Sequence, residues 1–345
     1  MQLQKKIIAN LPRVYAVSPI SIKGKTYFIA AAEEKGSCLL FSPPDWKTST
    51  IWNQPGGTME VVPLEKESGA FLAVQKFYPI FQSQEACIVY AEPESSITKP
   101  WKVTKVLDLP FVHRIGRVTV KNTPYVIAST LCSGKDYQED WTKPGAVYAG
   151  PIPADIHGSW EINPILEGIT KNHGLHVTTL DGRTSILVCG EEGIFNIIVP
   201  ENENEPWTTE QLVGKGVSDI YAFDLDNDGN KELITIEPFH GNHLKIYKRI
   251  AGKWDAVFEK KINFGHVVWG GMILGKPSVI FGCRGGSKGL AMVTDFDSKL
   301  QNTSCRVIDE GTGPASIKVI HMNDYELIIS ANHGVGEVAF YTISP

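Results

Sequence analysis

Histidine is the residue type in this chain best suited to chemistry, and several histidines fall in short polar segments between apolar runs. His240 and His243 are three residues apart, on either side of Gly241. Others lie at or near the start or end of apolar runs, at His113, His173, His176, His266 and His333. The imidazole titrates nearest neutral pH and is the commonest metal ligand, so these positions predict acid–base chemistry or metal binding.

A second group of charged residues follows a calcium-loop spacing. Residues 224–232 read DLDNDGNKE, which places carboxylates at alternate positions before a glycine, at Asp224, Asp226, Asp228 and Glu232. An EF-hand loop adds a bidentate glutamate at its twelfth position, and that residue is missing here. The spacing predicts a structural turn, with or without bound Ca²⁺, away from the histidines.

The elements that carry these residues form a repeat. Helical periodicity is almost absent, and short β-rich runs alternate with Gly, Pro, Asn and Asp. The unit is a strand, a tight polar turn, a very apolar strand, a longer loop, a third strand and often a fourth. Copies start near residues 13, 57, 112, 172, 217, 265 and 313. Seven copies give about 49 residues each, the size of a four-stranded propeller blade.

We therefore predict an all-β fold, a seven-bladed β-propeller, as a single domain over residues 1–345. The last copy has three strands, and an unassigned strand over residues 3–11 is free to complete it and close the ring. Six or eight blades are the nearest alternatives, because the copies at 57 and 112 carry long insertions.

Strand direction sorts the polar residues onto two faces. The starts of the first strands and the loops between second and third strands share one face, which receives seven of the nine histidines; His157 and His321 fall elsewhere. The candidate catalytic residues on that face are His113, His173, His176, His240, His266 and Tyr137. Candidate substrate-binding residues are Arg284, His333, Lys76, Tyr78 and Arg114. His240, His243 and His333 are the candidate ligands of a central divalent metal, Ca²⁺ or another. The alternative is that several of these histidines are satisfied polar residues lining a wet channel.

Two resemblances follow from these motifs. Residues 224–233 resemble the VCBS/FG-GAP repeats of many seven-bladed propellers. The histidine-rich rim, with Phe239-His240-Gly241 and Asn332-His333-Gly334, resembles propeller sugar lyases of the rhamnose–glucuronate lyase and aldos-2-ulose dehydratase types. That resemblance implies β-elimination at a sugar ring, with histidine or tyrosine as base and acid and a cation or arginine holding the acidifying group. Such enzymes are commonly secreted.

The sequence thus favours a carbohydrate-active lyase or dehydratase acting on a small saccharide that contains a uronate or a keto sugar. A glycoside hydrolase using the same pocket is one alternative. The other is a non-catalytic propeller scaffold that binds a protein or a glycan through aromatic residues of the long loops, Phe77, Tyr78, Tyr137 and Trp141.

Composition and motif searches exclude several other classes. A net charge of -5 argues against an extended nucleic-acid surface. No apolar run reaches the length of a membrane helix, and the first residues lack a signal-peptide core, which predicts a cytoplasmic protein. No phosphate-binding GxxxxGK[ST] loop is present, and the glycines of residues 282–287 are not followed by a helical pattern, so we expect no nucleotide cofactor. We expect a monomer, because a closed ring leaves no open sheet edge.

Overall fold

The computed structural model describes residues 1–78, 80–301 and 303–345, and strands dominate this part of the chain. The strands form seven antiparallel sheets of four strands each. This confirms the predicted seven-bladed β-propeller. Each sheet begins within four residues of a predicted repeat start, at Val14, Val61, Val112, Gly174, Asp219, Gly265 and Ser316.

The chain divides into two compact units, described here separately. Unit 1 comprises Met1–Lys6, Lys171–Val335 and Ala339–Pro345, and unit 2 comprises Ile7–Thr170 and Gly336–Val338. Unit 2 holds three sheets: β2 (Val14–Ile22), β3 (Lys25–Ala32), β4 (Cys38–Ser42) and β5 (Lys47–Trp52); β6 (Val61–Pro63), β7 (Phe71–Gln75), β8 (Cys87–Glu92) and β9 (Lys102–Asp108); β10 (Val112–Val120), β11 (Thr123–Thr130), β12 (Gly145–Pro151) and β13 (Asn163–Ile169). A short 3₁₀ helix, η1 (Ile80–Glu85), lies between β7 and β8.

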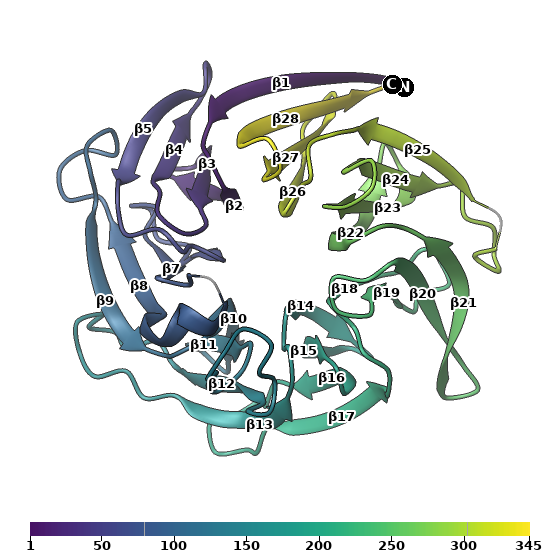
Figure 1. Ribbon diagram of the computed structural model, residues 1–345, viewed down its shortest axis with the longest axis horizontal. Coiled ribbons are helices and arrows are strands. Elements are labelled where there is room, and N and C mark those ends of the chain that lie inside the picture. Colours follow the sequence, from purple (N-terminus) through teal and green to yellow (C-terminus); the bar gives the residue numbers. More distant parts are fainter. Residues whose placement is uncertain (79, 302) are drawn as a thin grey trace. The chain divides into compact units, whose positions relative to one another are not determined.

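Unit 1 holds three further complete sheets and most of a fourth. They are β14 (Gly174–Leu180), β15 (Arg183–Gly190), β16 (Gly193–Ile198) and β17 (Thr208–Val213); β18 (Asp219–Phe223), β19 (Glu232–Glu237), β20 (His243–Ile250) and β21 (Lys253–Lys261); β22 (Gly265–Ile273), β23 (Lys276–Cys283), β24 (Leu290–Thr294) and β25 (Ser304–Asp309); β26 (Ser316–His321), β27 (Glu326–Asn332), β28 (Glu337–Ser344) and β1 (Gln2–Asn10). In Figure 1 the strands β14 to β28 follow one another from teal to yellow.

Burial explains why the second strand of each sheet is the most apolar. Every second strand has at least five consecutive buried residues, whereas the outer strands β17 and β21 are mostly exposed. Apolar side chains from neighbouring sheets of unit 1 form shared clusters, such as the one in which Ile234 and Ile236 of β19 pack with Val279 and Phe281 of β23. The first strands β14, β18, β22 and β26 contact one another in succession. Burial of both faces of each second strand thus fixes the first strands side by side.

The N-terminal strand completes the last sheet, as the sequence predicts. β1 is the outer strand of the sheet ordered β1-β28-β27-β26, and Figure 1 shows β1 in purple beside β28 in yellow. Lys5 Nζ lies 2.8 Å from Asp309 Oδ2 and 5.9 Å from the centre of the Tyr341 ring. Backbone pairing and the Tyr341 contact hold β1 on β28, and the Asp309 contact joins β1 to the end of β25.

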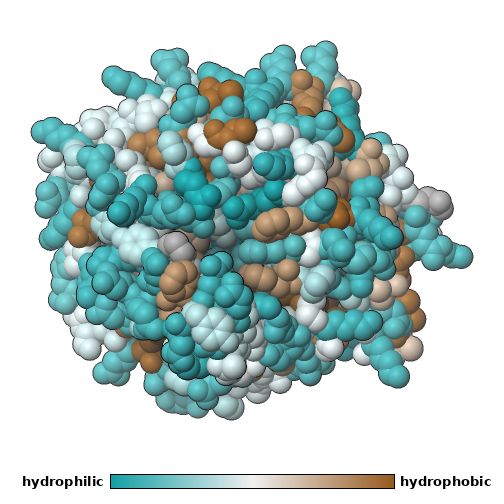
Figure 2. Space-filling model, in the orientation of Figure 1, coloured by the Kyte–Doolittle hydropathy of each residue, from teal (hydrophilic) through white to brown (hydrophobic). Residues whose placement is uncertain are grey.

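The surface in view is polar. Hydrophilic side chains cover most of the face drawn in Figure 2, with apolar side chains scattered in small groups. Among the described residues, no helix is long and apolar enough to cross a membrane.

Removal of β1 tests its role in the last sheet. A chain lacking residues 1–10 leaves β28 as an unpaired edge, and such edges destabilise a sheet and invite association. We expect the midpoint of thermal unfolding to fall by about 5 °C or more, since roughly 1 kcal/mol corresponds to a few degrees in proteins of this size. Light scattering should show concentration-dependent association. Ile7→Thr, at a side chain that is 48% exposed, is the control. An equal fall in the unfolding midpoint in the deletion and in Ile7→Thr contradicts the assignment of β1 as the strand that completes the last sheet.

Candidate functional site

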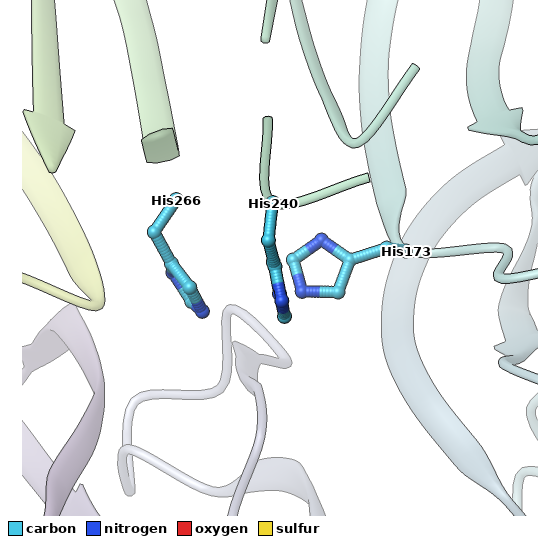
Figure 3. A group of neighbouring side chains, drawn as sticks. All are labelled: His173, His240 and His266. Atoms are coloured by element: carbon cyan, nitrogen blue, oxygen red, sulfur yellow. The ribbon is translucent and has the colours of Figure 1, made fainter. Parts of the chain in front are cut away.

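Three of the predicted histidines converge in unit 1. His173, His240 and His266 each place a ring nitrogen so that the three atoms lie within 4.8 Å of one another. The residues come from three successive sheets, separated by 67 and 26 positions in sequence. Figure 3 shows the rings of His240 and His266 edge-on and side by side, with the ring of His173 turned toward them.

Backbone carbonyls orient two of the three rings. His173 Nδ1 lies 3.0 Å from the carbonyl oxygen of Ser218, and His266 Nδ1 lies 2.9 Å from that of Ala315. A carbonyl only accepts, so Nδ1 carries the proton in both rings. Nε2 is therefore the nitrogen of each neutral ring that has a lone pair for a proton or a metal ion. Both residues are almost fully buried, at 2% and 1% exposure.

His240 is positioned by a tight loop between β19 and β20. Its backbone N–H donates to Ser218 Oγ at 3.0 Å, and its φ of +47° lies in the left-handed region. Position 241 requires glycine, because a Cβ there would lie 2.1 Å from the carbonyl carbon of Glu237. Ser218 thus contacts two of the three histidines, with its carbonyl toward His173 and its hydroxyl toward His240.

A β-bulge positions His266. The β22–β23 register shifts between Gly265 and Val267, so that His266 has no direct partner on β23. Bulges redirect a side chain relative to the pleat. Here the bulge is at the second residue of β22. The residue before it, Gly265, donates its N–H to the carbonyl of Gly241, so this end of β22 lies next to the loop that carries His240.

Aromatic rings enclose the cluster. The rings of His240 and His266 stack at 5.1 Å and 23°, and the ring of His173 stands perpendicular to both, at 88° and 89°. Phe239 and Phe264 lie 4.1 and 4.9 Å from the His240 ring. Apolar walls lower the local polarity and so strengthen electrostatic interactions at the imidazoles.

The donor set fits a divalent transition metal. Three neutral imidazoles suit Zn²⁺ and related ions, and metal-binding histidines commonly donate their other N–H to a carbonyl, as His173 and His266 do. The same arrangement also suits proton transfer, because it holds several imidazoles within reach of one reacting atom.

Arg284 and His333 form a neighbouring pair. Arg284 Nη2 lies 3.1 Å from His333 Nδ1, and arginine only donates, so the imidazole nitrogen accepts. The guanidinium carbon lies 5.7 Å from the centre of the Phe264 ring, whose ring also contacts His240. Phe264 therefore connects this pair to the histidine cluster.

Two predicted histidines of unit 1 lie apart from the cluster. His243 is the first residue of β20, and its Nε2 lies 3.2 Å from Oε1 of Glu259 on β21. His176 stacks on Tyr221 at 3.9 Å. Burial, with Lys231 and Lys318 nearby, lowers the pKa of His176 to about 3, so the ring is neutral near pH 7 and is a weak base. The structure thus groups His240 with His173 and His266, and not with His243 and His333.

The remaining predicted residues of the histidine-rich face belong to unit 2. His113 Nε2 lies 3.4 Å from the Tyr15 hydroxyl, and Arg114 Nη1 donates to the Met59 carbonyl and to Glu60 at 3.1 and 3.3 Å. Lys76 Nζ lies 3.6 Å from Glu85, the Tyr78 carbonyl accepts from Ser83 Oγ, and Tyr137 is 60% exposed. His113 and Arg114 are buried, and Tyr137 is a surface residue.

The ammonium group of a lysine from β20 lies among the carboxylates of the calcium-like turn. Lys248 of β20 contacts the carboxylates of Asp226, Asp228 and Glu232, and Asp224 accepts from the backbone N–H groups of Asp228 and Gly229. Asp224, Asp226 and Glu232 also have the spacing of a potential cation site. The Lys248 ammonium supplies positive charge to the buried carboxylates of Asp226 and Glu232 and to the exposed carboxylate of Asp228. Burial nonetheless raises the pKa of Glu232 to about 7.

Two residues that contact the predicted histidines, Ser218 and Tyr15, were not predicted from the sequence. Ser218 acts through its carbonyl and hydroxyl, and Tyr15 occupies the bulge position of β2 that His113 and His266 occupy in β10 and β22. A comparison of the second residue of each first strand would have found Tyr15. No sequence pattern marks Ser218.

Comparison with known proteins supports the fold alone. No family model and no curated protein matches the chain, so the resemblance to VCBS/FG-GAP repeats stays a prediction. The chain is similar to the soluble aldose sugar dehydrogenase of Escherichia coli, with a TM-score of 0.54 and 12% identity over 100% of both chains. It is similar to a candidate 6-phosphogluconolactonase of Bacteroides fragilis, with a TM-score of 0.55 and 13% identity over 92% of this chain and 88% of that chain. It is also similar to a chain of a mitotic checkpoint complex, with a TM-score of 0.62 and 8% identity over 99% and 93%.

Metal titration tests the donor set of the cluster. We expect the chain to bind one equivalent of Co²⁺ with the visible absorption of a nitrogen-ligated ion. His266→Ala should weaken binding by more than about 10-fold, the loss that removal of a hydrogen-bond partner behind a ligand already causes. His243→Ala is the matched control, because that ring contacts Glu259 instead. Equal affinity in all three proteins, or none in the unmodified chain, contradicts the assignment.

Replacement of Lys248 tests the acidic turn. Lys248→Met leaves buried carboxylates without their cation, and we expect a loss of about 3 kcal/mol in the free energy of unfolding. Millimolar Ca²⁺ should restore part of this loss in the variant and add little to the unmodified chain, as followed by urea unfolding. Lys253→Met, at the exposed first residue of β21, is the control. Strong stabilisation of the unmodified chain by Ca²⁺ would show that the lysine does not replace a metal.

Proposed function

We propose that this propeller is a carbohydrate-active enzyme, a lyase or dehydratase that acts by β-elimination on a small saccharide containing a uronate or a keto sugar. The observation that carries the proposal is the convergence of His173, His240 and His266 within 4.8 Å, beside an arginine. Buried imidazoles gathered from three sheets are costly to maintain as packing alone and are typical of catalytic or metal sites.

The substrate class rests on chemistry and on fold similarity. β-Elimination requires a base near a carbon-bound proton and a positive group near the adjacent carboxylate or ketone, and the cluster with Arg284 supplies both. A neighbour of the same fold is an aldose sugar dehydrogenase, which supports a sugar as the ligand.

His240 is the proposed base. It is half-buried, whereas His173 and His266 are buried with Nδ1 bound to carbonyls. Its ring takes the proton from the carbon next to the carboxylate or ketone. The electron pair of that C–H bond forms a carbon–carbon double bond as the β carbon–oxygen bond breaks. The leaving oxygen receives a proton from water, and the protonated His240 returns its proton to solvent.

Arg284 is the proposed partner of the acidifying group. Its guanidinium can bind a carboxylate by two parallel hydrogen bonds, which stabilises the charge that develops as the proton leaves. His333 accepts from Nη2 and so orients the guanidinium. A divalent cation bound by the three imidazoles would supply the same polarisation as a Lewis acid, and His240 would then be a ligand and not the base.

A non-catalytic binding function is the second candidate. The loop that contains Tyr137 exposes 60% of this side chain, as an anchor for a protein or glycan would require. On either proposal the chain acts as a monomer, without nucleic acid or membrane partners.

Turnover in single variants tests the enzyme proposal. Di- and trisaccharides with uronate or keto-sugar residues are assayed by the ultraviolet absorbance of the unsaturated product. We expect His240→Ala to lower kcat by about 10²–10⁴-fold, the usual contribution of a general base. Arg284→Met should also lower kcat, since the guanidinium stabilises the charge that develops as the proton leaves. His157→Ala, at an exposed loop position, is the control. Unchanged turnover in the first two variants removes the assignment and favours the binding function.

A further inference from the structure

A second group of side chains lies farther along the strands that carry the histidine cluster. His176, Tyr221, Trp269 and Lys318 belong to the four first strands of unit 1, β14, β18, β22 and β26. Each is paired with a buried apolar residue of the second strand, at Leu187, Ile234, Ile280 and Ile329 respectively. They therefore occupy equivalent positions in four successive sheets, and all four are half-buried.

Three of these side chains form a continuous aromatic row. The rings of His176 and Tyr221 stack at 3.9 Å and 29°, and those of Tyr221 and Trp269 lie 6.2 Å apart at 49°. The Trp269 indole extends over Gly271, where a Cβ would lie 2.4 Å from two of its ring carbons. A glycine two residues after the tryptophan on the strand thus leaves room for the ring to lie flat.

Lysines flank the aromatic row. Lys231 Nζ donates to Thr178 Oγ1 at 2.8 Å, and burial lowers the pKa of this lysine. Lys231 and Lys318 are both close enough to His176 to disfavour its protonated form. Since the His176 ring is neutral near pH 7, its role is that of a flat ring surface rather than a base. Because of the two lysines, the region around the row has positive potential, although the chain has a net charge of -5.

The distance from the histidine cluster is short. His173 and His176 are three residues apart at the start of β14, as are His266 and Trp269 on β22. At about 3.3 Å per residue this is roughly 10 Å, which is within the reach of a short saccharide.

We propose that the row His176–Tyr221–Trp269, flanked by Lys318 and Lys231, binds a uronate-containing sugar next to the sugar that reacts at the histidine cluster. Sugar rings present flat C–H surfaces that pack on aromatic faces, and the ammonium groups pair with the uronate carboxylate. The proposal rests on the proposed function only for the ligand class, because saccharide binding is measurable without turnover.

Calorimetric titration in a His240→Ala background tests this site. The probes are a β-1,4-linked diglucuronate and cellobiose, its neutral counterpart, at low ionic strength. We expect the diglucuronate to bind more tightly, by about 10-fold, with a preference that shrinks as salt is added. Lys318→Met should remove most of that preference, whereas Lys253→Met, at the exposed first residue of β21, should retain it.

Trp269→Ala should weaken binding of both sugars by about 10-fold, the upper range of an aromatic contact. Gly271→Ala is a second variant that displaces the indole without removing it, and it keeps the test valid should Trp269→Ala fail to fold. Circular dichroism confirms folding of each protein.

The outcomes separate this proposal from the enzymatic one. Unchanged affinities in the Trp269, Gly271 and Lys318 variants overturn the binding site, even where His240→Ala abolishes turnover. Binding that depends on Trp269 and Lys318 supports the site, even where no saccharide is turned over and the lyase proposal fails. Failure of the His240→Ala protein and the unmodified chain to bind either sugar also overturns it.

Discussion

The candidate site depends on a hydrogen bond that crosses from one sheet to the next. His173 donates Nδ1–H to the carbonyl of Ser218, the residue before β18, and His266 donates to Ala315, the residue before β26. Both bonds therefore bind an imidazole to the entry of the following first strand. A carbonyl at this point fixes the tautomer as well as the ring orientation, so Nε2 faces the centre of the cluster. Since Ser218 also accepts the His240 N–H through its hydroxyl, one residue sets the positions of two histidines.

The backbone at these positions departs from regular sheet geometry, and the surrounding sheets stabilise the departure. His240 has a left-handed φ, and His266 lies in a β-bulge. Each such feature costs free energy unless packing holds it. The adjoining second strands β19 and β23 supply that packing, because each has a run of six buried residues. The apolar strands thus carry the stability, and the irregular ends of their neighbours carry the histidines of the candidate site, as is common in folds whose loops hold the functional groups.

The sequence could predict the repeat but not the partners of each side chain. Strand periodicity and turn residues located seven sheets and the closing strand, because burial imposes the same apolar pattern on every copy. The face that carries His173, His240 and His266 also followed from strand direction. The HxxH spacing, by contrast, suggested that His240 and His243 act together, yet the turn at Gly241 sends His243 to Glu259. Lys248 could not be paired with the acidic turn in advance either, since it lies 16 residues after Glu232 and meets it only through strand pairing. The aromatic row was missed because Tyr221 and Trp269, taken alone, read as ordinary strand residues, and His176 was instead predicted as a catalytic residue.

On the two proposals above, the two regions of the first strands are parts of one binding path. Short-range chemistry lies at the strand ends, where bulges and loops can direct imidazoles toward one point. The row of His176, Tyr221 and Trp269 lies farther along, where regular pairing presents broad side chains at one level. A reacting group needs precise placement, whereas an adjacent sugar needs area and charge, and regular strands supply area at little cost in strain. The lysines beside the row oppose the overall negative charge of the chain, so an anionic ligand is attracted to this region and repelled elsewhere. That difference in potential favours an acidic saccharide over a neutral one before any contact with the histidines is made.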